Sequence, residues 1–264
     1  MPEGCPTCAV EGTPSNLCCA YDPGGSRELP YIETEGLGEG NTPLVPLRTE
    51  GASLAKLEFI NPTGSHKDRY SAQAVAHAVH AGYRCVCVAS SGNAGLSVAA
   101  YAARAGVECR VVVTPVVPRS LLDAVSATGA SVHVVTGSDA RWDLIRSWTG
   151  RDGGVLSLSN TVSPVIGSSP FGIEGYKAIA WELHDRLGRV PDAVLVPTSR
   201  GDLLSGIALG FAGMAAGPSA RVPRVYCVEP FARASAVLDG AAPVTADFPG
   251  DATATPSIGG HGVT

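Results

Sequence analysis

Short runs of β-branched residues alternate with amphipathic helical patterns along most of this 264-residue chain. This order is typical of parallel sheets with helices on their faces. We expect strands over residues 53–60, 85–89, 109–114, 131–136, 154–158, 193–197 and 224–229. We expect helices from Lys67 to a stop at Gly82 and over residues 94–104, 119–127, 139–148, 173–187 and 203–214. The predicted fold class is α/β, in which ligands lie outside the carboxyl ends of strands.

The composition excludes several classes of function. A content of 45% hydrophobic and 16% charged residues is ordinary for a soluble globular protein. The formal net charge of −5 argues against general nucleic-acid binding, which needs a basic face. The chain shows neither a signal sequence at its start nor an apolar stretch long enough to span a bilayer. We therefore expect a cytoplasmic protein without nucleic-acid or membrane partners.

Lys67 is the candidate catalytic residue. It lies in the run Asn61-Pro-Thr-Gly-Ser-His-Lys67-Asp-Arg-Tyr70, where Gly and Pro precede it and a helical pattern follows it. A lysine on a solvated helix face does not need so constrained an approach. A lysine that forms a Schiff base does, because its amine must meet one carbonyl carbon at a fixed angle.

A second candidate site follows the predicted strand 85–89, where an Ala-rich helix begins after a polar loop. The loop residues are Ser90, Ser91, Gly92 and Asn93. Serine hydroxyls, the amides of a helix N-terminus and an asparagine side chain make a cradle for a carboxylate. A simple N-cap and turn explains the same residues equally well. The pairing with the Lys67 loop favours the carboxylate site.

A third loop leads from the predicted strand 193–197 into a helix. It consists of Thr198, Ser199, Arg200, Gly201, Asp202 and Leu203. A phosphate at this place would gain backbone N–H donors, two hydroxyls and the planar guanidinium fork of Arg200. A carboxylate beside a dianion is unfavourable, so we expect Asp202 to face away or, more readily, to cap the helix.

These motifs resemble the fold-type II pyridoxal-phosphate enzymes, and within them threonine synthase and its relatives. The likeness is carried by residues 37–44 (LGEGNTPL), the lysine loop 61–69, residues 90–106 and residues 173–180 (IEGYKAIA), in the order of the family. It implies a two-domain α/β fold of the tryptophan synthase β type, with open twisted sheets in three layers. It also implies a cysteine-bearing segment at 1–35, a larger cofactor-binding domain at 36–77 and 166–264, and a smaller inserted α/β domain at 78–165.

The resemblance implies pyridoxal 5'-phosphate as the cofactor and an amino acid as the substrate. Lys67 would hold the cofactor and then act as general base and acid on the substrate carbons. Asn93 would hydrogen-bond the phenolic oxygen of the cofactor. The substrate carboxylate would be held by Ser90, Ser91, Gly92 and Asn93, and the cofactor phosphate by Thr198 to Leu203.

The sequence departs from the pattern of these enzymes in three places. Its phosphate loop is poorer in glycine, and His66 and Tyr70 stand where threonine synthases commonly carry Phe and Gly. His66 fits a proton relay and a structural role equally well. Relatives continue well beyond a segment like residues 253–260, whereas this chain ends at Thr264, so we expect a larger domain that is shortened at its C-terminus. Either a partner or second copy completes this domain, or the protein is a shortened relative with an open site, or the sequence is incomplete at the gene level. Without that region, the edge of a sheet and apolar surface would be exposed. We therefore expect a homodimer or a partner chain that supplies the missing region.

The cysteines fall into two groups. Cys5, Cys8, Cys18 and Cys19 could form a four-thiolate zinc site, although adjacent side chains in an extended chain point apart. Because relatives of threonine synthase often begin with a cysteine-bearing ribbon, we favour a vestigial ribbon without metal. In a reducing compartment we expect free thiols or metal ligands rather than a disulfide framework. The predicted strands contain Cys85, Cys87, Cys109 and Cys227, which we expect to be small core residues.

Three functions remain open at this point. The first is a threonine-synthase-like lyase or transferase that acts on an activated amino acid such as O-phosphohomoserine. The second is a β-eliminating or β-replacing enzyme that resembles serine and threonine dehydratases or cysteine synthases. The third is a non-catalytic binding or scaffold partner descended from such an enzyme.

Overall fold

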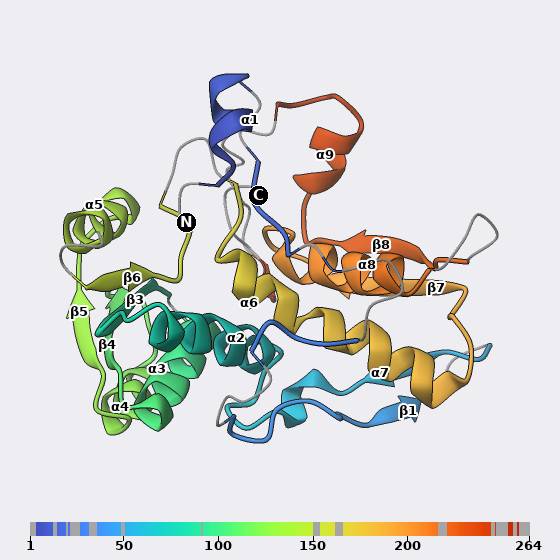
Figure 1. The fold of residues 1–264 in the computed structure, drawn as a ribbon, viewed down its shortest axis with the longest axis horizontal. Coiled ribbons are helices and arrows are strands. Elements are labelled where there is room, and N and C mark those ends of the chain that lie inside the picture. Colours follow the sequence, from blue (N-terminus) through green and yellow to red (C-terminus); the bar gives the residue numbers. More distant parts are fainter. Residues whose placement is uncertain are drawn as a thin grey trace. The chain divides into compact units, whose positions relative to one another are not determined.

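The computed structural model describes residues 4–12, 15–19, 21, 27–31, 36–48, 51–90, 92–149, 154–161, 166–215, 221–243, 246, 253–255 and 258. The chain divides into two compact units, shown as a ribbon in Figure 1. Unit 1 comprises Met1–Arg27 and Asn160–Thr264, and unit 2 comprises Glu28–Ser159. Each unit is described by itself.

Unit 2 is built around a four-stranded parallel sheet with the strand order β5-β4-β3-β6. The strands are β3 (Cys85–Ala89), β4 (Glu108–Val113), β5 (Ser131–Val134) and β6 (Val155–Ser157). The helices are α2 (Lys67–His80), α3 (Asn93–Ala105), α4 (Arg119–Ala127) and α5 (Ser138–Trp148). A short antiparallel hairpin of β1 (Leu44–Pro46) and β2 (Leu54–Lys56) precedes them, followed by the 3-10 turn η1 (Glu58–Ile60). The predicted alternation of strands and helices is confirmed.

The core of unit 2 lies on both faces of β3. Cys85 and Cys87 pack on one face with Ile145 of α5, and all three are exposed by 3% or less. Side chains alternate along a strand, so Val86 and Val88 point to the opposite face, where α2 and α3 contact β3. A strand buried on both faces needs an apolar run without polar alternation, which is what residues 85–89 provide.

Unit 1 contains a two-stranded parallel sheet of β7 (Ala193–Pro197) and β8 (Arg224–Val228), in which Leu195 pairs with Tyr226. Its helices are α1 (Pro6–Val10), α6 (Pro170–Gly175), α7 (Lys177–Leu187), α8 (Asp202–Met214) and α9 (Ala234–Leu238). Helix α8 packs against α6 and α7 through glycines. A Cβ at Gly206 would lie 2.5 Å from the Tyr176 Cβ, and one at Gly210 would lie 2.7 Å from the Lys177 carbonyl oxygen.

Two predicted elements were wrong in extent. The predicted strand 53–60 ends at Lys56, because its partner β1 is only three residues long and the chain then turns into η1. The predicted helix 173–187 is two helices, since hydrogen bonds between residues three apart replace the α-helical pattern at Tyr176. The other predicted strands and helices agree with the structure to within two residues at each end.

The predicted domains divide the chain differently from the two units. The predicted boundary after residue 77 falls inside α2, which is continuous to His80. The domain assignment itself stays a prediction. Among the helices of the described residues, none is both long and apolar enough to cross a membrane.

The close contact at Gly206 leads to a stability prediction. Gly206→Ala should lower the free energy of unfolding by about 1–3 kcal/mol, because the added methyl overlaps the Tyr176 side chain and the Ile173 carbonyl. Gly213→Ala in the same helix is the matched control, since its Cβ would meet no atom within 4 Å. The control should stabilise the helix by up to about 1 kcal/mol. Urea denaturation of both variants measures the difference, and equal effects would contradict the packing.

Candidate active site

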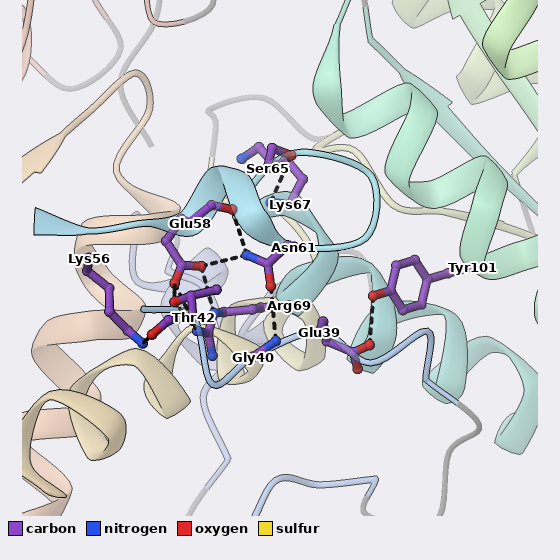
Figure 2. Close-up of polar contacts among 10 residues, drawn as sticks. All are labelled: Glu39, Gly40, Thr42, Lys56, Glu58, Asn61, Ser65, Lys67, Arg69 and Tyr101. Atoms are coloured by element: carbon purple, nitrogen blue, oxygen red, sulfur yellow. Dashed lines mark hydrogen bonds and ion pairs between the residues drawn. The ribbon is translucent and has the colours of Figure 1, made fainter. Parts of the chain in front are cut away.

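Lys67 is the first residue of α2, and its side chain is half-buried (Figure 2). The turn before it uses Gly64 at φ 87°, a value that favours glycine. The Lys67 amide then donates to the Ser65 hydroxyl at 3.3 Å. The next two residues, Asp68 and Arg69, are exposed by 3% or less. The two buried residues that follow in α2 therefore fix the backbone at Lys67, while the lysine side chain keeps part of its surface exposed.

Asp68 joins the lysine loop to α3. Its carboxylate accepts hydrogen bonds from the Thr63 amide at 2.6 Å, from the Thr63 hydroxyl, and from the Ser97 hydroxyl at 2.6 Å. The same Ser97 oxygen lies 2.7 Å from the Ser71 hydroxyl of α2. Three donors compensate a fully buried carboxylate. Because Ser97 is one turn into α3 and Asp68 is in the first turn of α2, the N-termini of these two helices lie side by side.

Arg69 forms an ion pair with Glu58, in which the Arg69 side chain is buried and the Glu58 side chain is 17% exposed. Its guanidinium donates from Nε at 2.7 Å and from Nη2 at 2.8 Å to the two carboxylate oxygens, which is a bidentate arrangement. The Thr42 hydroxyl adds a hydrogen bond at 2.6 Å and the Asn61 amide adds one at 3.0 Å. We call Thr42, Glu58, Asn61 and Arg69 the Arg69 network (Figure 2).

The Arg69 network connects segments that are distant in sequence. The Gly40 amide donates to the Asn61 side-chain oxygen at 3.0 Å, and the Lys56 ammonium donates to the Thr42 carbonyl at 2.6 Å. The segment before the hairpin, strand β2, η1 and α2 are thereby tied together. No sequence motif marks Glu58, whereas Thr42 and Asn61 lie inside the motifs 37–44 and 61–69.

Glu39 and Tyr101 attach residues 37–44 to α3. The Tyr101 hydroxyl donates to the Glu39 carboxylate at 2.7 Å, and the Leu37 amide donates to the same oxygen at 3.0 Å. Burial and this carboxylate raise the pKa of Tyr101, so the phenol stays protonated and remains a donor. Three of the four sequence motifs thus meet in unit 2, around the first turns of α2 and α3.

The Ser90 loop follows β3 and opens α3. The Ser90 hydroxyl accepts the amides of Gly92 at 3.2 Å and Gly95 at 2.9 Å, so it holds the loop itself. Gly95 lies in the first turn of the 13-residue helix α3, so Ser90 satisfies one of the amides at the start of this helix. A Cβ on Gly92 would meet no atom within 4 Å. Asn93 is exposed. Ser91 lies outside the described residues, and the predicted roles of Ser90, Gly92 and Asn93 stay predictions.

The third loop belongs to unit 1 and joins β7 to α8. Gly201 is the N-cap of α8 at φ 115°, and no side chain caps this 13-residue helix. Thr198 is buried, and its hydroxyl donates to the Val196 carbonyl at 2.7 Å. The remaining loop residues are half-buried, namely Ser199, Arg200, Asp202 and Leu203. Their contribution to a phosphate site stays a prediction.

Asp202 does not cap α8, so this prediction was wrong. Its carboxylate instead accepts the Ser168 hydroxyl at 2.7 Å and the Ser168 amide at 3.3 Å. The Asn16 side chain donates to the Ser168 carbonyl at 2.9 Å. The segment before α6 therefore hydrogen-bonds to the Asp202 carboxylate.

His66 precedes Lys67 and is half-buried. Burial, together with the positive charges of Lys67 and Arg69, lowers the pKa of His66 to about 3. The ring is therefore neutral near pH 7 and can take part only as a neutral imidazole.

In the structure the eight cysteines are free thiols. Cys85, Cys87 and Cys109 are core residues, and burial raises the pKa of Cys87 and Cys109 to about 12. Cys227 is only half-buried, which corrects the prediction that it belongs to the core. Across the described residues, His, Cys, Asp and Glu form no group of three or more that could hold a metal ion.

Residues 36–262 match the sequence profile of the family described as pyridoxal-phosphate dependent enzyme. The chain belongs to this family. A threonine synthase from Halalkalibacterium halodurans is 38% identical over 194 residues, which cover 70% of this chain and 51% of that protein. The predicted resemblance to threonine synthases is thereby confirmed. The chain spans about half the length of the curated relatives it matches.

Solved structures confirm the fold class. Maize serine racemase superposes with a TM-score of 0.69 at 22% identity, covering 84% of this chain and 66% of that one. An L-serine ammonia-lyase from Rhizomucor miehei superposes with a TM-score of 0.62 at 25% identity, covering 75% and 63% of the two chains. The fold is the α/β fold of the fold-type II pyridoxal-phosphate enzymes.

The Arg69 network predicts a large cost for Glu58→Ala. The substitution leaves the Arg69 guanidinium buried without its carboxylate and should lower the free energy of unfolding by about 3–5 kcal/mol. The matched control is Asp123→Ala, which breaks an exposed pair whose Arg119 and Asp123 side chains are 86% and 61% exposed. The control should change stability by less than about 0.5 kcal/mol. Urea denaturation compares the two, and a loss below about 1 kcal/mol for Glu58→Ala would contradict the structure.

His66 predicts a loss of stability in acid. The unfolded chain takes up a proton on this ring near pH 6.5, while the folded chain does so only near 3. Between these values the unfolded state binds more protons, so the stability present above pH 6.5 is lost as the pH falls towards 3. His66→Gln should therefore lose less stability on acidification than the wild type. NMR titration of the imidazole checks the cause, and a midpoint near the ordinary value would contradict it.

Proposed function

We propose that this chain binds pyridoxal 5'-phosphate through Lys67 and acts on an amino-acid substrate. The observation that carries the proposal is the setting of Lys67. The two residues directly after it are buried. Glu58 binds Arg69, and Thr63 and Ser97 bind Asp68. A fixed backbone with a half-buried side chain suits a lysine that must meet one carbonyl carbon.

The donors of the chain fit a phosphorylated carbonyl compound. Lys67 supplies a primary amine for the carbonyl. Helix α8 has 13 residues and no side-chain cap at its N-cap residue, so its N-terminal amides favour an anion. In α3 the Ser90 hydroxyl accepts the Gly95 amide, and the positive end of the helix dipole still favours an anion there. The open space beside Gly92 leaves room for an anion at the start of α3.

The chain's own residues then have distinct roles in the proposal. The first turn of α8 and the hydroxyls of Thr198 and Ser199 bind the cofactor phosphate, with Arg200 as an added cation. Asn93 orients the cofactor ring, and the loop Ser90 to Gly92 holds the substrate carboxylate. Bound pyridoxal phosphate supplies an electron sink for a negative charge at the substrate Cα. Lys67 removes and returns protons at the substrate carbons.

We propose a threonine-synthase-like elimination and replacement on an activated amino acid, of which O-phosphohomoserine is an example. The support is sequence similarity, since the threonine synthase of Halalkalibacterium halodurans is 38% identical over 194 residues. That stretch covers 70% of the chain.

A β-elimination or β-replacement is the second candidate. The support is the L-serine ammonia-lyase from Rhizomucor miehei, which is 25% identical and superposes with a TM-score of 0.62. Both reactions begin with proton removal at Cα, and they differ in whether a proton also leaves Cβ. The fixed backbone at Lys67 and the space beside Gly92 at the start of α3 suit either reaction.

The cofactor test uses the purified chain with added pyridoxal phosphate. We expect a visible absorbance band in the wild type that is absent in Lys67→Ala and in Lys67→Arg, which keeps the charge but cannot condense with a carbonyl. Borohydride reduction followed by peptide mapping should place the cofactor on Lys67. Asp123→Ala, on an exposed pair, should keep the band.

Product assays separate the candidates once the cofactor is bound. Phosphate release from O-phosphohomoserine supports the first candidate, and release of ammonia or sulfide from β-substituted amino acids supports the second. A chain that stays colourless in excess cofactor contradicts both, and it favours a non-catalytic binding or scaffold partner.

A further inference from the structure

Cys5 and Cys8 form a pair of interacting thiols at the start of α1, outside the candidate active site. Cys5 is the N-cap of this helix, and its sulfur accepts the Cys8 amide at 3.5 Å. Both side chains are half-exposed, so reagents in solution can reach them. Residues three apart in one helical turn are neighbours, and a disulfide needs cysteines that are neighbours in space.

The two thiols of this pair are not equivalent. Hydrogen bonds from the backbone and the thiol of Cys8 lower the pKa of Cys5. The neighbouring Cys5 thiol and burial raise the pKa of Cys8. In thiol–disulfide exchange the thiolate is the nucleophile, so this difference makes Cys5 the attacking group and Cys8 the thiol that follows.

The turn that carries the pair is held from outside α1. The Cys5 amide donates to the Ser15 carbonyl at 2.9 Å, and a Cβ on Gly4 would lie 2.4 Å from the Ile166 side chain and 2.5 Å from the Ser15 carbonyl oxygen. The next residue, Asn16, donates to the Ser168 carbonyl at 2.9 Å. These contacts fix the Cys5 backbone against the segment before α6, so the proximity of the thiols does not depend on the short helix alone.

The other N-terminal cysteines do not complete a metal site with this pair. Cys18 is exposed, and burial raises the pKa of Cys19 to about 11, with the negative charge of Glu174 adding to the effect. In the part of the chain that the structure describes, which includes all four of these cysteines, no group of three or more ligand residues could hold a metal ion. The pair therefore stands by itself as a dithiol.

We propose that Cys5 and Cys8 are a redox-active dithiol, which a low-molecular-weight disulfide oxidises reversibly to a Cys5–Cys8 disulfide. The Cys5 thiolate attacks one sulfur of the small disulfide, forms a mixed disulfide and expels one small thiolate, which takes up a proton. The Cys8 thiol then loses its proton, attacks the Cys5 sulfur and expels the second small thiolate. Two protein thiols and one small disulfide become one protein disulfide and two small thiols, so two electrons pass to the small disulfide.

The test incubates the full chain in buffers of reduced and oxidised glutathione at graded ratios. Acid then stops the exchange, free thiols are alkylated, and mass spectrometry maps the products. We expect the wild type to lose two hydrogens, both from the Cys5–Cys8 peptide, and to recover them under reducing ratios. Cys8→Ser should carry one glutathione on Cys5, and Cys5→Ser should carry several-fold less on Cys8. Cys18→Ser is the matched control and should form the same disulfide as the wild type.

Three results would overturn the dithiol. The pair could stay reduced at every glutathione ratio, the disulfide could join other cysteines, or added zinc could protect all four N-terminal thiols from alkylation at one metal per chain. The mapping of the wild type needs no substitution, so a variant that fails to fold does not weaken the test. None of these measurements involves pyridoxal phosphate, so their outcome is independent of the proposed function.

Discussion

The bidentate ion pair between Arg69 and Glu58 is the interaction on which the geometry of unit 2 depends. Placing two charges in a protein interior costs free energy, and the cost is offset only when every polar atom finds a partner. Here the Thr42 hydroxyl and the Asn61 amide satisfy the remaining carboxylate positions. Each of these partners comes from a different part of the chain, so the satisfied pair also specifies how the segment 40–42, η1 and α2 meet.

The position of Lys67 follows from this pair and from Asp68. Arg69 binds the chain before the lysine loop, and Asp68 binds both the loop and Ser97 of α3. The side chain of Lys67, which lies directly before these two residues, is half-buried. The same Ser97 contact brings the starts of α2 and α3 together. Two helix N-termini that lie side by side favour an anionic ligand.

Several features of the site could be predicted from residues alone because they are local. Gly64 and Pro62 mark a turn, the Ala-rich run after Asn93 marks a helix, and the apolar run 85–89 marks a buried strand. These patterns place each loop at the carboxyl end of a strand or the start of a helix without any knowledge of partners. Other features depended on which segments of the chain lie next to one another after folding. The strand over 53–60 stopped early because β1 is short, and Asp202 bonded to Ser168 instead of capping α8 because that segment lies within reach.

The sequence by itself determined the alternation of strands and helices, the family of the chain and the lysine on which the proposed function rests. The physical reason is that helical and strand periodicity, turn residues and a constrained lysine are properties of neighbouring residues. Only the tertiary structure decided which polar groups hold Lys67 in place and that Ser90 holds its own loop. It also decided that Asp202 binds Ser168 instead of capping its own helix. These outcomes depend on which donors and acceptors become neighbours after folding, and the order of residues does not state that.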